Sequence, residues 1–432
     1  MARMLGKLFR VVLSLLAWII RIAVMLALLQ SSTIQLGDRW TAIGIIVRDE
    51  QFDYVTWELN AVAAKAEQML YGLAPFMNET DRSAYVRSYF ADLQAVRALE
   101  ERINIVYADP AVTDPDAVTV EQRAERDARR ANLASRQGIV ESILEGQVAS
   151  VLVDLGFGTA GQLLPPISMR FTQVPNLLIV SPRDQIRFDV SLNLNPMPVD
   201  AIAALESQID AAQNVSSLVV PLGGIALYPA MILETTSLEF AINTFAHEWL
   251  HHYLFAFPLG LNYDFAGEAR IINETTAKIF GDEVAPLVLR RYYPDLAPPE
   301  VTPTVITEPT PNRTPDLNVQ PPFDFGAAMH ETRTTVDGLL ADGRVEEAEA
   351  YMEERRALFV ENGYNIRKLN QAYFAFYGGY QSGSPGAGGS DPIGPAVRAI
   401  LDESESIHAW IVIMREITTR EELLAAVPAV DE

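Results

Sequence analysis

TFAHEWLHHYL, residues Thr244 to Leu254, concentrates three of the chain's five histidines beside a glutamate. His247 and His251 are four residues apart, so on a helix they project from the same face one turn apart, close enough to hold one metal ion. Glu248 is placed to take a proton from a zinc-bound water, which is how the HExxH pattern works mechanically. The stretch therefore predicts a zinc site. The alternative is that both histidines are ordinary buried residues of an apolar helix.

The residues around this stretch favour a helix. Apolar side chains recur there at helical spacing, and neither proline nor glycine interrupts residues 238–254. This apolar surface comprises Leu238, Phe240, Ala241, Phe245, Trp249, Leu250, Tyr253 and Leu254.

A third protein ligand is needed if the fourth zinc position is to stay open for water. Residues 269–284, ARIINETTAKIFGDEV, favour a second helix, and Glu274 lies 23 positions after His251. The local string INETTAKIFG resembles the ligand helix of the gluzincin, or thermolysin-like, metallopeptidases. This resemblance covers about 45 residues and implies one zinc ion per chain, with Glu274 completing the His247 and His251 ligand pair and Glu248 as catalytic base. Glu268, 17 residues after His251, is the competing third ligand.

Two features depart from the family pattern. The separation between the histidines and the glutamate is a few residues longer, and Lys278 stands where the family usually has an aspartate that orients the first histidine. Another group must supply that hydrogen bond, and Asp264 and Asp282 are the candidates. In gluzincins the helical half of the protein also donates to the transition-state oxyanion, and spacing does not rank the candidates here, which are Tyr377, Tyr380, His330 and His408.

The N-terminal region differs from the rest of the chain in charge and hydropathy. The first 47 residues carry five basic residues and one acidic residue, whereas the whole chain has a net charge of −23. The apolar run Val11 to Leu29 follows three of these basic residues, which predicts an uncleaved membrane anchor. The localisation expected is single-pass in the cell membrane, with the N-terminus cytoplasmic and the catalytic domain outside. A cleaved signal peptide and an amphipathic surface helix are the alternatives.

The amino-acid composition excludes some classes of partner and of catalytic chemistry. A net charge of −23 argues against nucleic acid, because phosphate binding needs clustered Lys and Arg. The absence of cysteine excludes a thiol nucleophile and a disulfide framework. The partners expected are a peptide or protein substrate and, through the N-terminal helix, a membrane.

The chain divides by composition into five parts. We expect an N-terminal membrane anchor over residues 1–35, a helical spacer over 36–164, a catalytic core over 165–292, a proline-rich linker over 293–323 and a helical subdomain over 324–432.

Short β-like runs predict the sheet of the catalytic core. Residues 168–174, 176–180 and 185–193 suggest an antiparallel meander, and residues 199–213 favour a helix. The apolar stretch 216–234 contains prolines and glycines, which favour strands over the alternative of a second membrane span. By the resemblance, an edge strand over Gly224 to Leu233 would bind extended peptide beside the active-site helix, and the alternative is a plain core strand.

Together these features predict an α+β fold with a zincin-like core: an antiparallel or mixed sheet, an active-site helix and a ligand helix, with helical flanks and an N-terminal transmembrane helix. The function they predict is that of a membrane-anchored zinc metallopeptidase, in which Glu248 assists attack of a zinc-bound water on a peptide bond. The alternative is a non-catalytic, membrane-anchored interaction or assembly factor with a peptidase-like fold.

Overall fold

The computed structural model describes residues 14–22, 24, 38–264, 267–299, 323–378 and 386–428. The chain forms two compact units, Met1–Asp49 and Glu50–Glu432. In the first unit, residues 14–22 are helical, and the side chain of Asp38 caps α2 (Arg39–Ile46) by accepting from Thr41 N at 3.0 Å. The candidate site lies in the second unit.

Helices dominate the part of the chain that the structure describes. The predicted α+β class is therefore wrong, because 65% of the structure is helical and its sheets are small. The helices of the second unit are α3 (Tyr54–Tyr71), α4 (Glu79–Ala108), α5 (Pro115–Val118), α6 (Val120–Leu152), α7 (Val199–Gln213), α8 (Leu238–Leu254), α9 (Pro258–Leu261), α10 (Gly267–Tyr292), α11 (Phe325–Ala341), α12 (Val345–Glu361), α13 (Gln371–Tyr373), α14 (Ile393–Asp402), α15 (Ile407–Met414) and α16 (Arg420–Ala426). Short 3₁₀ or π segments are Ala74–Phe76, Val153–Phe157 and Phe374–Gly378.

The predicted transmembrane helix, and with it the single-pass membrane localisation, is also corrected. Among the described residues, no helix is both long enough and apolar enough to cross a membrane. Of the predicted span Val11 to Leu29, residues 14–22 and 24 are helical, and the remainder lies outside the described residues. The same finding removes the alternative of a second span over residues 216–234, which form strands instead.

The strands in the described ranges form two sheets of three strands and one of two. In the first sheet β8 is central, parallel to β3 and antiparallel to β7. In the second, β4 is central and antiparallel to both β5 and β6. The predicted meander is therefore divided between two sheets, because β3 pairs with a strand that follows it by about 60 residues in the chain. The strands are β1 (Gly158–Thr159), β2 (Gln162–Leu163), β3 (Met169–Thr172), β4 (Asn176–Pro182), β5 (Val190–Leu194), β6 (Val215–Pro221), β7 (Gly224–Ile225) and β8 (Ala230–Leu233).

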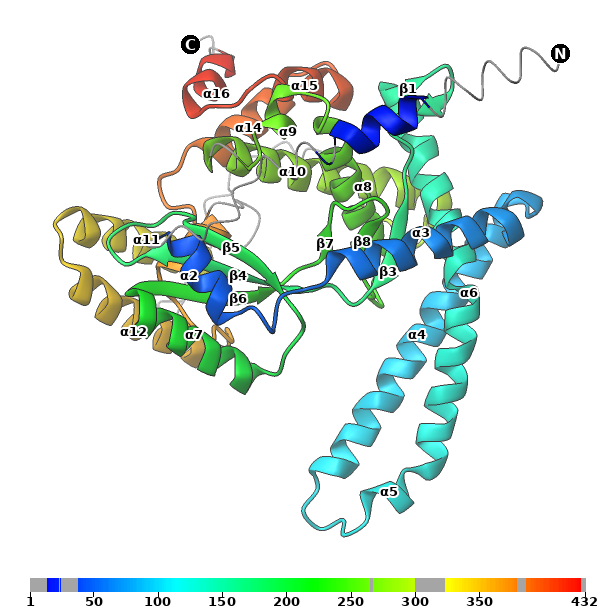
Figure 1. The fold of residues 1–432 in the computed structure, drawn as a ribbon, viewed down its shortest axis with the longest axis horizontal. Helices are drawn as coiled ribbons and strands as arrows, with labels where there is room; N and C mark the ends of the chain where they lie inside the picture. The colour runs from blue at the N-terminus through cyan, green and yellow to red at the C-terminus, as the bar shows by residue number, and fades with distance from the viewer. Residues whose placement is uncertain are drawn as a thin grey trace, which may run out of the picture. The chain divides into compact units, whose positions relative to one another are not determined.

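One hydrophobic core joins α4, α6, α8, α10, β3 and β8. Figure 1 shows α4 and α6 as a long antiparallel pair, and their inner halves bury apolar side chains such as Leu93 and Leu144 in the same core as Phe245 of α8. Glu141 and Glu145 of α6 accept from the backbone N–H groups of Phe171 and Met169 at 2.8 and 2.7 Å, which caps the open edge of β3. The helical pair thus supports the sheet that lies beside α8.

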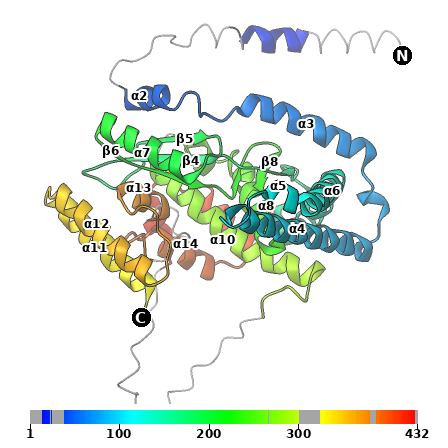
Figure 2. The same ribbon diagram turned by 90° about the horizontal axis from the view of Figure 1, so that it is seen from below.

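A second core forms where sheet β5-β4-β6 packs against the C-terminal helices. Ile179 and Val220 of the sheet share it with Met329 of α11 and Phe359 of α12, and both views show α11 and α12 as an antiparallel hairpin (Figures 1 and 2). A cleft is lined by Leu177, Leu222 and Phe376, which belong to or pack against the second core, and by residues of α8 and α10, whose buried faces lie in the first core.

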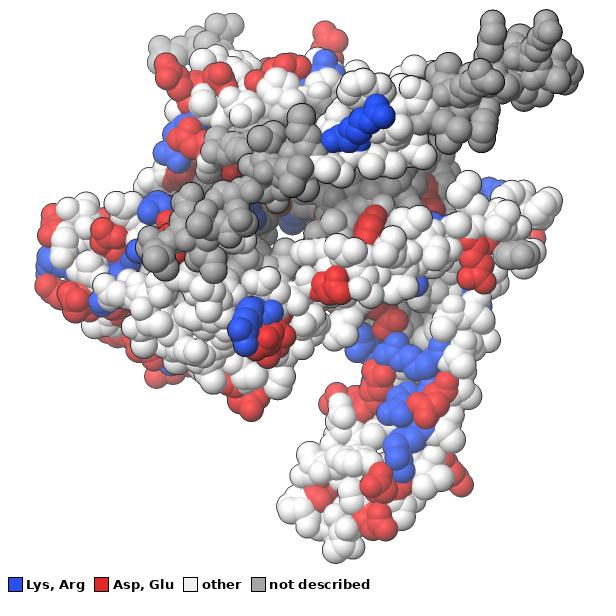
Figure 3. Space-filling view, viewed as in Figure 1, with Lys and Arg blue, Asp and Glu red and all other residues white. Residues whose placement is uncertain are grey.

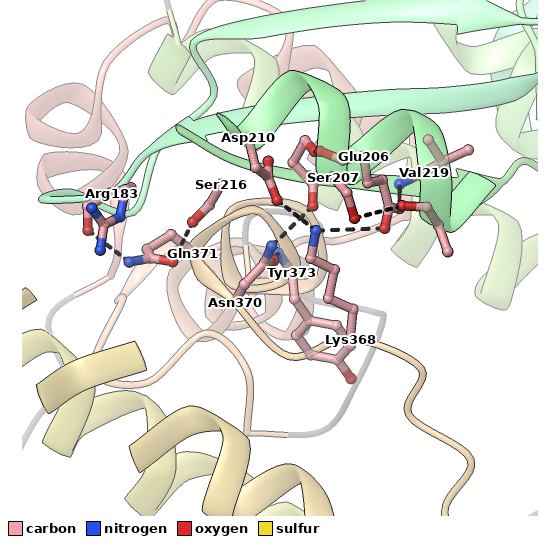
Figure 4. Close-up of polar contacts among 12 residues, drawn as sticks. Arg183, Glu206, Ser207, Asp210, Ser216, Val219, Lys368, Asn370, Gln371 and Tyr373 are labelled. Carbon is pink, nitrogen blue, oxygen red and sulfur yellow. Dashed lines mark hydrogen bonds and ion pairs between the residues drawn. The ribbon is translucent and has the colours of Figure 1, made fainter. Parts of the chain in front are cut away.

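Partly exposed ion pairs and hydrogen bonds hold residues 367–373 against the second sheet and α7. Glu206 of α7, 2% exposed, accepts from Val219 N at 2.7 Å and from Arg367 Nη2 at 2.6 Å. Lys368 Nζ donates to Asp210 at 2.8 Å, and Ser216 Oγ donates to Gln371 at 2.6 Å (Figure 4). These contacts fix the segment that leads to Phe376, which lines the cleft.

The charges on the α4–α6 pair are of both signs. Figure 3 shows Lys and Arg interspersed with Asp and Glu along this hairpin. Arg129 pairs with Asp92 at 3.3 Å, and Arg130 pairs with Glu100 and Glu234 at 2.8 and 2.6 Å. The arginines of α6 therefore lie beside carboxylates in a mixed surface, whereas a phosphate-binding surface would need a cluster of positive charge.

Candidate metal centre

The helix α8 has one buried face and one face on a cleft. Its start is capped by Ser237, whose hydroxyl accepts from Phe240 N at 3.1 Å. The buried face comprises Leu238, Ala241, Ile242, Phe245, Ala246, Trp249, Leu250 and Leu254. The cleft face comprises Glu239, Phe240, Asn243, Thr244, His247, Glu248, His251 and His252. The predicted helix is thus present, and His247 and His251 share the cleft face.

The helix α10 lies beside α8 in both ribbon views (Figures 1 and 2). The approach is close at Gly281, where a Cβ atom would be 2.8 Å from Asn243 Oδ1. Asn243 Nδ2 donates to Asp282 Oδ1 at 2.9 Å, and Lys278 Nζ donates to the same oxygen at 2.6 Å. This contact fixes how the two helices are aligned and brings Glu274 opposite the histidines.

Three candidate ligand atoms converge between the two helices. His247 Nε2 and His251 Nε2 are 3.1 Å apart, and Glu274 Oε2 is 3.6 Å from each of them. A tetrahedral zinc site with bonds of about 2.0–2.1 Å requires ligand atoms roughly 3.3 Å apart. The three atoms therefore fit a zinc ion after shifts of a few tenths of an ångström, and they leave the fourth position open.

Glu248 is the second carboxylate near the histidines. Candidate ligand atoms of His247, Glu248 and His251 all lie within 4.8 Å of one another. This grouping is looser than the one that includes Glu274, so Glu274 matches the third-ligand position better. Glu248 is 4% exposed, and burial raises the pKa of its carboxyl, although the neighbouring histidines act to lower it. A carboxyl with a raised pKa is a stronger proton acceptor.

The charges of the candidate ligands are strongly coupled. Burial alone would raise the pKa of Glu274, but the charge of His251 and hydrogen bonds from both histidines hold it well below its usual value. Burial alone would lower the pKa of His251, but the Glu274 carboxylate raises it to about 9. Without a metal, a protonated His251 therefore balances the buried carboxylate. A cation bound here would take over this role, and His251 would then be neutral.

Two further side chains orient the ligands. Asn273 Oδ1 accepts from His251 Nδ1 at 2.7 Å, which leaves Nε2 of that ring to face His247 and Glu274. Tyr263 OH donates to the other carboxylate oxygen of Glu274. These contacts hold one ligand ring and one ligand carboxylate, as the partners of metal ligands do in known sites.

The site opens into a cleft of about 1170 Å³. One wall comes from α8, α10 and β7, and the other includes Leu177, Ser191 and Phe376 from the second sheet and the C-terminal part of the chain. Phe240 and Phe255 are 40% and 72% exposed, so apolar rings are available along the α8 side. The volume is that of a site for a substantial ligand rather than for an ion alone.

The strand β7 approaches Glu248 closely. At Gly224 a Cβ atom would be 2.3 Å from Glu248 Oε1 and 2.9 Å from Thr244 Cγ2. Any side chain at this position would have to displace the glutamate. His252, the third histidine of the HExxH stretch, turns towards the same region and donates from Nε2 to Leu227 O at 2.7 Å, so it does not join the candidate ligands.

The alternative third ligand and the two candidate partners of His247 lie in different parts of the structure. Glu268 is exposed, and its carboxylate accepts from Arg420 N at 3.0 Å. Asp264 lines the cleft, and Asp282 is held by Asn243 and Lys278.

The described residues among the four candidate oxyanion donors lie in separate parts of the structure. His330 is exposed on α11, and the His408 ring packs against Phe157 with centroids 4.9 Å apart. Tyr377 packs against Tyr373 in the second core, and Tyr380 lies outside the described residues.

The sequence did not predict Tyr263, Asn273 or Arg270, which line the cleft, and it placed Gly224 only in a candidate edge strand, without its approach to Glu248. Asn273 could have been found, because it directly precedes Glu274 and can contact an adjacent ligand. Tyr263 and Gly224 come from a loop and a short strand whose approach to the site has no periodic signal in the sequence.

Comparison of the chain with known protein families, with curated proteins and with solved structures finds no match. The assignment of function therefore depends on the chemistry and geometry of the site itself.

Proposed function

We propose that the chain is a zinc-dependent metallopeptidase that hydrolyses peptide bonds. The observation that carries this proposal is the triangle of His247 Nε2, His251 Nε2 and Glu274 Oε2, with sides of 3.1, 3.6 and 3.6 Å, beside the buried carboxylate of Glu248. Two imidazoles and one carboxylate form a donor set that suits zinc and leaves one position open, as catalytic zinc sites do.

A zinc ion held by these three residues would supply a Lewis acid and lower the pKa of water in the open position to about 7. Glu248 accepts a proton from the attacking water and returns it to the leaving amine. Its burial raises its pKa, which makes it a stronger acceptor of the proton from the attacking water. Tyr263 holds Glu274 through its hydroxyl, and Asn273 holds His251, so the groups around the reacting bond are fixed before substrate arrives.

The cleft favours an extended peptide as substrate. β7 is an edge strand, paired with β8 on one side only, and residues 223–226 line the cleft next to Glu248. An edge strand offers backbone N–H and C=O groups that pair with an added strand. A peptide paired with β7 would pass the candidate metal ligands, which explains how the site could bind many sequences through backbone contacts.

The test of this proposal is metal content measured together with hydrolysis. The full-length chain, reconstituted with zinc, should hold one equivalent per chain and cleave some members of a broad set of unstructured proteins and peptides. Removal of zinc with a chelator should stop cleavage, and added zinc should restore it. Less than about a tenth of an equivalent of zinc after reconstitution would contradict the proposal, because structured sites of this kind bind the metal tightly.

Replacing Gly224 with Ala should reduce hydrolysis about 100-fold, since catalytic groups displaced by about 1 Å lose that much. The added Cβ would meet Glu248 Oε1 at 2.3 Å, so the carboxylate must move, whereas the metal ligands lie on α8 and α10 and should keep the zinc. Gly146→Ala is the matched control, because a Cβ at Gly146 would have no neighbour within 4 Å. Unchanged hydrolysis by Gly224→Ala, measured at equal zinc content, would show that the absence of a side chain at position 224 is not needed to hold Glu248 in its catalytic position.

A further inference from the structure

Arg270 occupies the cleft one helical turn before Glu274 on α10. Residues four apart on a helix share a face, so its side chain projects to the same side as the candidate ligand. Its guanidinium carbon is 5.0 Å from the centre of the Phe188 ring and 5.1 Å from that of the Tyr263 ring. Arg270 Nη1 also donates to Ser191 Oγ at 3.2 Å. Contacts from two rings and one hydroxyl thus fix the guanidinium in the cleft wall.

Tyr263 links this guanidinium to the candidate metal centre. The Tyr263 ring meets the His251 ring edge to face, with centroids 6.0 Å apart, while its hydroxyl donates to Glu274. Arg270 is therefore separated from the histidine by one aromatic ring. An extended peptide advances about 3.3–3.6 Å per residue, so the guanidinium lies within about three residues of the bond that would be cleaved.

We propose that Arg270 is a specificity residue that binds a carboxylate of the substrate, and this inference rests on the proposed peptidase function. A planar guanidinium fixed by stacking suits bidentate binding of a carboxylate and loses little conformational entropy when it does so. The carboxylate belongs either to a Glu or Asp side chain near the cleaved bond or to the C-terminus of the substrate.

The other charges of the chain bear on whether Arg270 could bind an acidic group. The chain carries a net charge of −23, so its long-range field repels acidic peptides. Lys278, the cation one turn beyond Glu274, is paired with Asp282 at 2.6 Å and is largely neutralised. An acidic group would therefore be recognised in this cleft by short-range contacts, and loss of the contact with Arg270 should reduce the preference.

The experiment compares fluorescent peptides that differ in one charge. One pair has Glu or Gln at a single position close to the cleaved bond, and a second pair ends in a carboxylate or an amide. Cleavage is measured with the zinc-loaded full-length chain, and equilibrium binding is measured with Glu248→Gln, which should not consume the peptide. In at least one pair the acidic member should be favoured about 10–100-fold, which corresponds to hydrogen bonds with a charged group. The pair that shows the preference identifies the source of the carboxylate.

Arg270→Gln, alone and combined with Glu248→Gln for binding, should reduce that preference to less than about twofold, while Arg270→Lys should retain part of it. Arg187→Gln is the matched control, since Arg187 is exposed and pairs with Asp189 outside the cleft. If Arg270 had a purely structural role, Arg270→Gln would lower zinc content or thermal stability, and it would reduce cleavage of both peptides of a pair equally.

Two results would overturn the inference: no acidic preference in the wild type by cleavage or binding, or a preference that survives Arg270→Gln. If wild type cleaves nothing but Glu248→Gln still binds the acidic member more tightly, and Arg270→Gln removes the difference, the carboxylate site stands and the peptidase proposal fails.

Discussion

Glu248→Gln should lower hydrolysis about 10²–10⁴-fold, the contribution that general-base assistance typically makes. The amide is nearly the same size and shape as the carboxylate, so it fits the space against Gly224, but it cannot accept a proton from the attacking water. Zinc content should stay at the wild-type level, because Glu274 is nearer than Glu248 to the position of a third ligand. Cleavage rate, zinc content and melting temperature, measured on one preparation, test all three expectations.

Glu239→Gln provides the control for this substitution. Glu239 lies in the first turn of the same helix and lines the same cleft, but it is exposed and two turns from the histidines. Its loss should change the rate by less than about threefold, the usual scale for an exposed charge. Equal cleavage by wild type and Glu248→Gln would remove Glu248 from the mechanism. Zinc binding without cleavage in either protein would favour a non-catalytic interaction factor.

The local features of the site could be predicted from sequence because they repeat with the period of a helix. The spacing of His247 and His251 and the apolar residues around them predict one helix with a polar face and a buried face, which the structure contains. The helix over residues 199–213 is confirmed with the same bounds for the same reason. Glu274 was selected from a local resemblance, and the structure brings it to 3.6 Å from both histidines, although its role as a ligand stays a prediction.

The fold class could not be predicted because it depends on which elements share a core. Residues 36–164 are expected to form a helical spacer, yet Leu93 and Leu144 within this range are buried together with Phe245 of the candidate site helix. The β-like runs do form strands, but prolines and glycines around Pro221, Gly224 and Pro229 keep β7 and β8 short. The sheets are consequently too small for the predicted α+β architecture.

Contacts between segments far apart in the sequence explain why Tyr263, Arg270 and the approach of Gly224 to Glu248 could not be predicted. Tyr263 contacts Glu274 from the loop between α9 and α10, and Gly224 contacts Glu248 from a strand in another part of the chain. Arg270 is fixed partly by Phe188, which precedes it by about 80 residues. None of these pairs has a regular spacing, so only the folded chain reveals them. All three surround the candidate metal centre, where side chains from several elements must converge.

Glu274→Ala should remove most of the zinc, whereas Glu268→Ala should not. Loss of a partner that merely orients a ligand costs about 10–100-fold in metal affinity, so loss of a ligand itself should cost more than about 100-fold. Glu274 Oε2 is 3.6 Å from both histidine nitrogens, while the exposed Glu268 carboxylate accepts from Arg420 N. Competition with a chromophoric zinc chelator measures each affinity.

Glu274→Gln is a control for misfolding of Glu274→Ala, because it keeps the size of the side chain and can still accept the hydrogen bond from Tyr263. It lacks the negative charge that balances the charge of zinc. It should also bind zinc much more weakly than wild type. If Glu268→Ala loses the metal and both Glu274 variants keep it, the ligand role passes to Glu268. If Glu248→Gln loses the metal and the Glu274 variants keep it, Glu248 is the third ligand, and the metal site consists of His247, Glu248 and His251. The general base would then be another residue of the cleft.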